Sequence, residues 1–362
     1  MSMESDTPKS REAFHRDYQL RLVAWEVTRS CNLNCVHCRA SSNRGPYSRE
    51  LDTVKAIEVL EQVREVGEPI IILTGGEPLL RKDIFALADY GTKKGLRMVM
   101  ATNGTLITPD IAASTVESGI KRVSISLDGA TRESHDSFRQ VEGAFDGAIQ
   151  GISCLKEQGI EFQINTTVTR YNLHELEGIL NLGVHLGAVA HHIFLLVPTG
   201  RAKEMVNQEL DAQEYEDTLR WFYRQHDTVP LELKATCAPQ YYRIMRQEAH
   251  SKGEKVRSKR YGLDAVTRGC LAGISYCFIS HEGIVQPCGY LELNSGDLME
   301  STFSDIWKNS SIFDDLRDFS KYKGKCGRCE YITVCGGCRA RSYAAHGDYL
   351  SEEPLCAYIP PR

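Results

Sequence analysis

The run TRSCNLNCVHCRA, residues Thr28–Ala40, decides how this chain is interpreted, because it places three cysteines on one short segment. Cys31, Cys35 and Cys38 have the spacing C-x3-C-x2-C. Iron–sulfur clusters are usually held by four thiolates. A [4Fe–4S] cluster held by only these three would keep one iron open, and an open position separates a catalytic metal site from a closed structural one. The alternatives are three reduced structural cysteines or part of a zinc site.

The composition is that of an ordinary globular protein. Of its 362 residues, 42% are apolar and 25% are charged, and the net charge is −5, which disfavours a general nucleic-acid binder. The first twenty residues are polar and charged, unlike a signal peptide. No apolar run reaches the roughly 18–20 residues of a membrane helix. We therefore expect a cytoplasmic protein that binds neither nucleic acid nor membrane.

The number of cysteines is high for a protein of this kind. There are 13, and all except Cys154 and Cys237 fall between residues 31 and 38 or between residues 270 and 356. In a reducing compartment such clusters indicate metal ligands rather than disulfides. Cys154 lies within a helical pattern, and we expect it to pack in the core.

Strands and helices alternate from residue 21 onward, which indicates βαβ units and a parallel sheet. The expected strands are Leu22–Thr28, Pro69–Thr74, Arg97–Ala101, Arg122–Leu127, Glu161–Val168 and His191–Val197. The pattern fits a partial (β/α)6 barrel better than a flat doubly wound sheet but does not separate the two. We divide the chain into a polar leader (1–20), an α/β unit (21–235), a helical linker (236–265) and a cysteine-rich domain (266–362).

Polar residues and glycines follow the expected strands, where the active sites of barrels lie. The second strand runs into Gly75, Gly76, Glu77 and Pro78; the two glycines would let the backbone approach a ligand, although a tight turn is the alternative. The later strand ends carry further candidates, which alternatively form turns or, for the arginine, lie at the surface: Asn103, Ser126, Asp128, Arg139, Asn165 and Thr167.

The three-cysteine motif followed by GGEP resembles the radical S-adenosylmethionine (SAM) superfamily. The resemblance implies a partial (β/α)6 TIM-like barrel in which Cys31, Cys35 and Cys38 hold a [4Fe–4S] cluster. The open iron would chelate SAM, and reductive cleavage would give a 5′-deoxyadenosyl radical. Glu77 and the GGEP backbone would accept hydrogen bonds from the SAM ammonium. The other strand-end residues would contact its carboxylate, ribose and adenine.

The C-terminal cysteines resemble the SPASM/twitch-type extension of radical SAM enzymes, which implies one or two auxiliary [4Fe–4S] clusters. The implied ligands are Cys270 and Cys288 with Cys338 for an inner cluster, and Cys326, Cys329, Cys335 and Cys356 for an outer one. The last spacing departs from the family, with two residues before Cys338 where three are usual. Cys237 and Cys277 both remain candidates for the fourth inner ligand. Two C-x2-C pairs could alternatively bind structural zinc.

Longer sequence segments resemble the heme b synthases of the siroheme-dependent heme pathway, for example KCGRCEYITVCGGCRARSYAAHGDYLSEEPLC, which ends at Cys356. The implied reaction is oxidative decarboxylation of two propionates of Fe-coproporphyrin III to vinyl groups. An auxiliary cluster would accept the electron left on the substrate after CO2 is lost. A low-potential donor such as ferredoxin or flavodoxin would supply the electron that cleaves SAM. One departure from the relatives is Ser295, where several of them would have a cysteine.

The four carboxylates of such a substrate favour arginine contacts. The candidates are Arg21, Arg39, Arg201, Arg243 and Arg268, while a histidine or tyrosine could approach the iron. We expect His191 and His192 to be structural. The alternatives are a related tetrapyrrole enzyme (didecarboxysiroheme deacetylase or the heme d1 pathway), a peptide-modifying SPASM enzyme, and a zinc-ribbon scaffold without catalysis.

Overall fold

The computed structural model describes residues 18–253 and 268–361. Its strands form one ten-stranded sheet in the order β10-β9-β8-β1-β2-β3-β4-β5-β6-β7, with seven consecutive parallel strands from β1 to β7. The strands are β1 (Leu22–Thr28), β2 (Ile70–Gly75), β3 (Arg97–Thr102), β4 (Val123–Ser126), β5 (Phe162–Val168), β6 (Ala190–Leu195), β7 (Glu232–Thr236), β8 (Tyr276–Ile279), β9 (Ile284–Gln286) and β10 (Gly296–Asp297).

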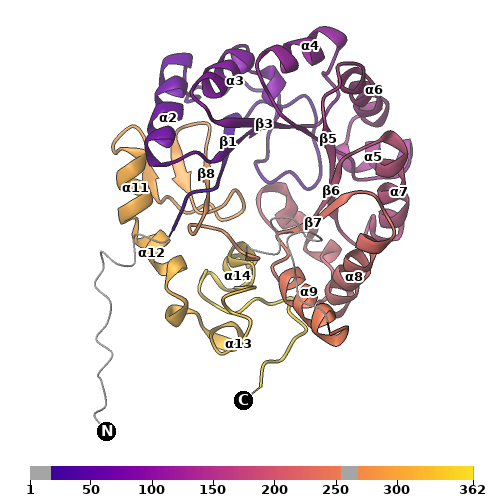
Figure 1. The fold of residues 1–362 in the computed structure, drawn as a ribbon, viewed down its shortest axis with the longest axis vertical. Helices are drawn as coiled ribbons and strands as arrows, with labels where there is room; N and C mark the ends of the chain where they lie inside the picture. The colour runs from indigo at the N-terminus through magenta and orange to yellow at the C-terminus, as the bar shows by residue number, and fades with distance from the viewer. Residues whose placement is uncertain (1–17, 254–267, 362) are drawn as a thin grey trace.

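The helices of the described residues are α2 (Thr53–Val66), α3 (Ile84–Lys93), α4 (Pro109–Glu117), α5 (Arg132–Arg139), α6 (Ala144–Glu157), α7 (Leu176–Leu186), α8 (Ala212–Arg224), α9 (Gln240–Ser251), α11 (Phe303–Asn309), α12 (Ser311–Arg317), α13 (Gly324–Gly327) and α14 (Arg339–His346). Figure 1 shows α2, α3, α4, α6, α7 and α8 around the outside of the curved sheet, whereas α13 and α14 lie in the C-terminal region. None of the helices in the described ranges is long and apolar enough to cross a membrane.

The amphipathic pattern of each barrel helix explains its place. In α2 the buried residues Ala56, Val59, Leu60 and Val63 recur at the spacing of one helix face, and Asp52 caps the helix by accepting a hydrogen bond from the backbone of Lys55. This apolar face packs onto the outer side of the strands.

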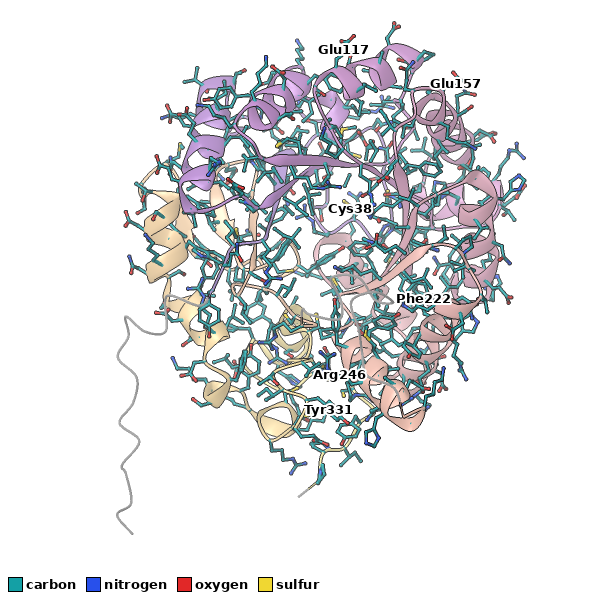
Figure 2. The ribbon with its side chains drawn as sticks, viewed as in Figure 1. Cys38, Glu117, Glu157, Phe222, Arg246 and Tyr331 are labelled. Carbon is teal, nitrogen blue, oxygen red and sulfur yellow. The ribbon has the colours of Figure 1, made fainter. Side chains whose placement is uncertain are left out.

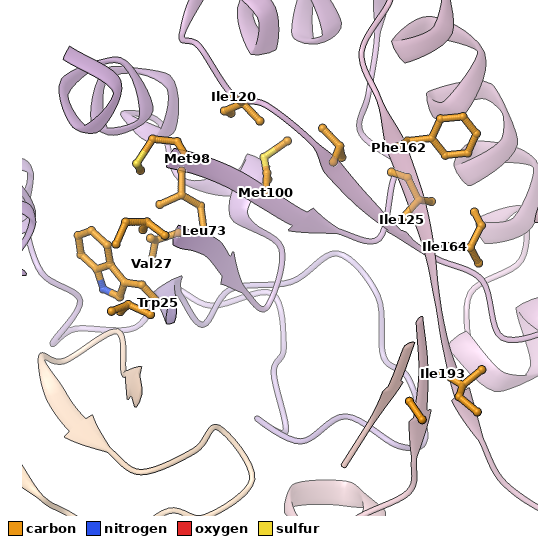
Figure 3. Close-up of a cluster of buried hydrophobic side chains, with 14 of the residues drawn as sticks. Trp25, Val27, Leu73, Met98, Met100, Ile120, Ile125, Phe162, Ile164 and Ile193 are labelled. Atoms are coloured by element: carbon orange, nitrogen blue, oxygen red, sulfur yellow. The ribbon is translucent and has the colours of Figure 1, made fainter. Parts of the chain in front are cut away.

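The two faces of the parallel strands differ in burial. Figure 3 shows the layer between strands and helices, where Leu73, Met100, Ile125, Ile164 and Ile193 are fully buried. The residues next to these in sequence point to the opposite, inner face, which we call the lumen, because side chains alternate along a strand. Several lumen residues are only half-buried, among them Ile72, Ser124, Ser126, Asn165, Thr167, His192, Phe194 and Lys234. The inside of the barrel is therefore accessible and largely polar on the side of β4–β7.

The partial barrel that the sequence predicts is confirmed, with one strand more than expected. The seventh parallel strand, β7, pairs with β6 from Ala190↔Glu232 to Phe194↔Thr236. This strand was not predicted, because it falls in a charged stretch of sequence that favours helices. The helical linker is α9 where described, but residues 254–267 lie outside the described residues, as does most of the predicted polar leader.

The C-terminal region is joined to the barrel through β1. Strand β8 pairs in parallel with β1 from Leu22↔Tyr276 to Trp25↔Ile279. Just beyond, Glu26 Oε1 lies 2.8 Å from His281 Nδ1, and Arg39 Nη2 donates to Glu26 Oε2 at 2.7 Å. Burial alone would raise the pKa of Glu26, but Arg39 and His281 outweigh it and hold this pKa at about 2. A buried ion network thus ties the cysteine loop to the C-terminal region.

Candidate functional site

The loop after β1 carries the first three cysteines at the carboxyl end of the barrel. Cys31 and Cys35 are buried and Cys38 is half-buried. Figure 2 places Cys38 inside the ring of strands and helices that forms the barrel, whereas Glu117 and Glu157 lie on the outer edge of this ring. Each sulfur has an N–H donor: Leu33 N to Cys31 at 3.4 Å, Ser42 N to Cys38 at 3.4 Å and Arg139 Nη1 to Cys35 at 3.6 Å. Donors of this kind stabilise sulfur that carries negative charge, as in a cluster.

Burial favours the neutral form of the Cys31 and Cys35 thiols. Burial raises the pKa of Cys31 to about 12, and it raises the pKa of Cys35 as well. Binding a metal cluster therefore has to release protons from the loop.

Neighbouring segments hold the loop in place through its backbone. Arg201, in the segment after β6, donates from Nε to the Cys35 carbonyl at 2.8 Å and from Nη1 to the Ser42 carbonyl at 2.9 Å. Asn34 N and Val36 N donate to the carbonyls of Arg139 and Phe138 at the end of α5. The protein's own side chains and backbone thus hold the loop in place.

The glycines of the GGEP turn contact the protein itself. A Cβ on Gly75 would lie 2.3 Å from the Thr28 carbonyl oxygen, and one on Gly76 would lie 2.3 Å from that of Ser30. The Gly76 and Glu77 amides donate to these two carbonyls at 2.8 Å each. The glycines therefore let β2 lie against the root of the cysteine loop, and the predicted close approach of this turn to a ligand stays a prediction.

Glu77 is fully buried and already accepts hydrogen bonds. Its Oε1 accepts from Thr102 Oγ1 at 2.7 Å and Leu79 N at 3.1 Å, and its Oε2 accepts from Asn103 N at 2.8 Å. The carboxylate joins the ends of β2 and β3. Its predicted contact with the SAM ammonium stays a prediction, for which Oε2 has the greater free capacity.

Asp128 and Arg139 form a buried ion pair beneath the loop. Arg139 Nη2 contacts Asp128 Oδ2, while Asp128 Oδ1 accepts from Thr167 N at 2.6 Å. Asp128 is fully buried, and Arg139 is 7% exposed. Burial raises the pKa of Asp128, against the opposing charge of Arg139. In this structure both residues therefore support the loop, with Arg139 reaching Cys35 from the ion pair.

The remaining strand-end candidates differ in how fully they are engaged. Asn103 Nδ2 donates to Asn32 Oδ1 at 2.9 Å within the cysteine loop, and Asn165 Oδ1 accepts from Gln163 Nε2 at 2.9 Å. Ser126, Asn165 and Thr167 are half-buried on the lumen face. They remain candidates for SAM contacts.

The C-terminal cysteines fall into two groups. Cys237 is half-buried, and its neighbouring thiols are those of Cys338, Cys288 and Cys270. Cys277 points to the other face of β8, where Arg317 is its charged neighbour. Of the two cysteines that the sequence left open, Cys237, directly after β7, lies with the inner group, and its role as a ligand stays a prediction.

The outer group lines a single hollow at the surface. Cys326, Cys329, Cys335 and Cys356 form its walls together with Arg243, Lys325 and other residues. Cys326 Sγ accepts from Glu353 N at 3.3 Å and Arg339 Nη2 at 3.6 Å, and Cys335 Sγ accepts from Gly337 N at 3.5 Å. Four sulfurs, N–H donors and nearby cations fit an anionic iron–sulfur cluster.

Sequence reasoning missed a buried arginine beside the inner group. Arg341, 1% exposed, donates from Nη1 to the Cys237 carbonyl at 3.2 Å and from Nη2 to the Leu196 carbonyl at 2.8 Å, and it pairs with Glu353. Its position in GGCRARS, three residues after Cys338, gave no signal beyond proximity to a cysteine. Cys154 packs in the core, as predicted.

Most of the predicted substrate arginines have other contacts. Arg201 supports the cysteine loop, and Arg39 pairs with Glu26. Arg243 pairs with Glu216, and Arg268 lies 4.1 Å from the centre of the Phe319 ring. Arg21 precedes β1, at the opposite end of that strand from the cysteine loop. Contact of any of the five with a substrate carboxylate stays a prediction.

Comparison with known proteins gives the family. Residues 25–183 match the model described as "Radical SAM superfamily", and residues 270–339 match the model described as "Iron-sulfur cluster-binding domain". The chain is 55% identical over 342 residues to the "AdoMet-dependent heme synthase" of Nitratidesulfovibrio vulgaris, covering 94% of this chain and 93% of the relative. The chain belongs to the radical SAM superfamily, among the AdoMet-dependent heme synthases.

Other similarities are more distant. The "Fe-coproporphyrin III synthase" of Methanosarcina barkeri is 31% identical, with 92% of this chain and 87% of that protein covered. Streptococcus suis SuiB bound to S-adenosylmethionine has a TM-score of 0.73 at 18% identity, covering 94% of this chain and 78% of SuiB. The SuiB likeness shows the fold alone.

This radical SAM enzyme uses a [4Fe–4S] cluster with SAM, and its C-terminal domain binds auxiliary iron–sulfur clusters. The cysteine loop and the two C-terminal cysteine groups described above fit these cofactors.

Replacing Arg139 by Gln should destabilise the protein, because Asp128 would keep a buried charge without its partner. We expect a loss of about 3–5 kcal/mol in the free energy of unfolding, the usual cost of breaking a buried pair, and a weaker EPR signal of the SAM-binding cluster. Chemical denaturation and EPR measure the two effects. Arg132→Gln on the same helix, which removes an exposed pair with Asp146, is the control and should change little. Equal effects of the two variants would contradict this role.

Replacing Cys237 by Ala should abolish one auxiliary cluster and leave the other, since only the inner group loses a ligand. EPR of the dithionite-reduced protein would show the loss of one auxiliary signal. Cys277→Ala is the matched control and should keep all signals. Loss of a signal in Cys277→Ala, with none lost in Cys237→Ala, would reverse the assignment.

Proposed function

We propose that this enzyme converts two propionates of Fe-coproporphyrin III to vinyl groups by oxidative decarboxylation, which gives heme b. The observation that carries the proposal is the 55% identity to an AdoMet-dependent heme synthase over nearly the full length of both chains. The relative named Fe-coproporphyrin III synthase is much less similar, at 31%. This difference favours heme formation over the reaction of that relative.

The proposed reaction needs a hydrogen-atom acceptor and an electron acceptor. Each propionate loses one hydrogen atom from its β-carbon, one CO2 and one electron as it becomes a vinyl group. When bound, the SAM-chelating cluster and SAM supply the radical that takes the hydrogen atom, and an auxiliary cluster supplies the electron acceptor.

Three groups of cysteines in this chain would hold the clusters that this reaction needs. We assign Cys31, Cys35 and Cys38 to the SAM-chelating cluster, with Arg139 and Arg201 fixing their loop. We assign Cys237, Cys270, Cys288 and Cys338 to an inner auxiliary cluster, and Cys326, Cys329, Cys335 and Cys356 to an outer one. A low-potential donor such as ferredoxin or flavodoxin would supply the reducing electron.

Tyr290 lies between the first and second cysteine groups. Burial raises its pKa; its neighbouring charged groups include Cys237, Arg39, Cys288 and Cys38. Arg39 Nη1 donates to the Gly289 carbonyl at 3.3 Å, so the segment after Cys38 touches the segment after Cys288. The inner group is thus the auxiliary site adjoining the SAM-chelating site, which makes it the better placed acceptor for an electron leaving the substrate.

An anaerobic product assay tests the proposed function. The reconstituted enzyme is given SAM, dithionite and Fe-coproporphyrin III, and mass spectrometry follows the porphyrin. We expect loss of one and then two carboxyl groups, with 5′-deoxyadenosine formed. Cys35→Ala should abolish both products, whereas Cys154→Ala, which changes a cysteine in the helix layer, should retain them. Deoxyadenosine formed without any change in the porphyrin would contradict the proposed substrate.

A further inference from the structure

A short turn, CGGC at residues 335–338, joins the outer group of cysteines to the inner group. Both of its glycines have a positive φ, 77° for Gly336 and 64° for Gly337. A Cβ on Gly336 would lie 2.2 Å from Arg268 Nη2. A Cβ on Gly337 would lie 2.4 Å from Arg339 Nη2. Each glycine therefore leaves room for one guanidinium group to pack against the turn.

Arg268 is a cation with unused hydrogen-bond donors. Its Nη2 donates to the Ile332 carbonyl at 3.1 Å, and its Cζ lies 4.1 Å from the centre of the Phe319 ring. Its Nε and Nη1 are buried and have no hydrogen-bond partner among the described residues. The neighbouring thiols include Cys270 of the inner group and Cys335 of the outer group. Buried donors normally have partners, so these two are suited to an acceptor that arrives with a cofactor.

Arg339 is a second cation beside the same turn, and it is fully buried. Its Nη2 donates to Cys326 Sγ at 3.6 Å, within the outer group. Its Nη1 donates to the carbonyls of Tyr349 and Ser351 at 3.0 Å and 2.7 Å, and its Cζ lies 4.7 Å from the centre of the Tyr322 ring. None of these acceptors is a carboxylate.

The arginines that adjoin only the inner group have carboxylate partners. Arg341 pairs with Glu353 at 3.3 Å, and Arg39 pairs with Glu26 at 2.7 Å. The hydrogen bonds of the two arginines at the CGGC turn go instead to backbone carbonyls and to sulfur. Burying a cation without an opposite charge is costly. The two arginines are therefore suited to an anion held by the cysteines on either side of them.

An iron–sulfur cluster with thiolate ligands is an anion of this kind. Two such clusters joined by one short turn repel each other, and each becomes harder to reduce, because reduction adds further negative charge. Positive charge and N–H donors between the clusters weaken the repulsion and raise both reduction potentials, since these potentials depend on net charge and on hydrogen bonds to sulfur.

We propose that Arg268 and Arg339 form a cationic layer between the two auxiliary clusters, which donates hydrogen bonds to their sulfur atoms and raises both reduction potentials. The inference rests on the cluster ligands of the proposed function, and not on its substrate. It gives Arg268 a role other than the predicted contact with a substrate carboxylate. It also gives a reason for the two consecutive glycines between the last two C-x2-C cysteines.

An anaerobic redox titration followed by EPR measures the potential of each cluster in the assembled enzyme. Cys329→Ala, which removes an outer ligand, and Cys237→Ala, which removes an inner one, assign the signals. Arg268→Met should lower the potentials of the auxiliary clusters by about 59 mV, equal to a roughly tenfold change in the ratio of reduced to oxidised cluster. The SAM-chelating cluster in the same sample should keep its potential and is the internal control.

Two further variants separate the buried layer from charge in general. Arg268→Lys keeps the positive charge and should restore most of the potential. Arg328→Met removes an exposed arginine beside the outer ligand Cys329, and it should shift the potentials much less because water screens its charge. Unchanged potentials in Arg268→Met, or equal shifts in Arg268→Met and Arg328→Met, would overturn the layer.

A measurement on the unaltered enzyme decides the matter if Arg268→Met fails to assemble. The protein is labelled with arginine that carries ¹⁵N only in its guanidinium group, and pulsed EPR is recorded on the reduced sample. We expect nitrogen couplings on the signals of the auxiliary clusters, and their absence would overturn the layer. Protein that assembles no auxiliary cluster would overturn the ligand assignment and this inference with it. The porphyrin product assay, by contrast, tests the proposed substrate independently of these potentials.

Discussion

The buried ion pair between Asp128 and Arg139 is the interaction on which the catalytic loop depends. Neither group has enough contact with water to remain charged alone, so each requires the other. From this pair Arg139 reaches Cys35 with its side chain, while its backbone carbonyl accepts from Asn34. Thr167 of β5 completes the support of Asp128. A loop that must bind a cluster at its edge is therefore held by the carboxyl ends of several strands.

The barrel and the C-terminal region share their functional parts. Strand β8 extends the sheet from β1, and Arg39 links the first cysteine loop to Gly289. Cys237 follows barrel strand β7 but faces Cys270, Cys288 and Cys338 of the C-terminal region. Arg341 returns from α14 to the Cys237 carbonyl. The predicted boundary near residue 236 separates Cys237 by sequence from the C-terminal cysteines that lie next to it in the structure.

The sequence predicted the features that depend on short spacing and periodicity. The parallel barrel strands, the three-cysteine loop after β1 and the core position of Cys154 follow from local pattern and are seen in the structure. Strand β7 could not be predicted, because its pairing with β6 overrides a charged sequence. The sequence could not separate Cys237 from Cys277, because their surroundings depend on the folded sheet: Cys277 lies within β8 near Arg317, whereas Cys237 follows β7 near the inner cysteines.

The contacts of the arginines could not be predicted either, because they too depend on the folded structure. A substrate with four carboxylates favours contacts with arginine side chains. In this structure, however, Arg39 pairs with the carboxylate of Glu26, and Arg201 donates to the backbone carbonyl of Cys35. The inner faces of the strands instead bring together residues that are distant in the sequence, such as Asn165 and His192 on β5 and β6. Residues that position a substrate in a barrel are brought together by the sheet, not by a motif.

The central claim is that one chain holds three separate iron–sulfur clusters, two of them auxiliary. Iron and acid-labile sulfide analysis of the anaerobically reconstituted protein, with Mössbauer spectroscopy of the same sample, tests it most directly. The account predicts about twelve iron and twelve sulfide per chain, all in [4Fe–4S] form. About eight of each, or zinc in place of iron in the C-terminal cysteines, would contradict it.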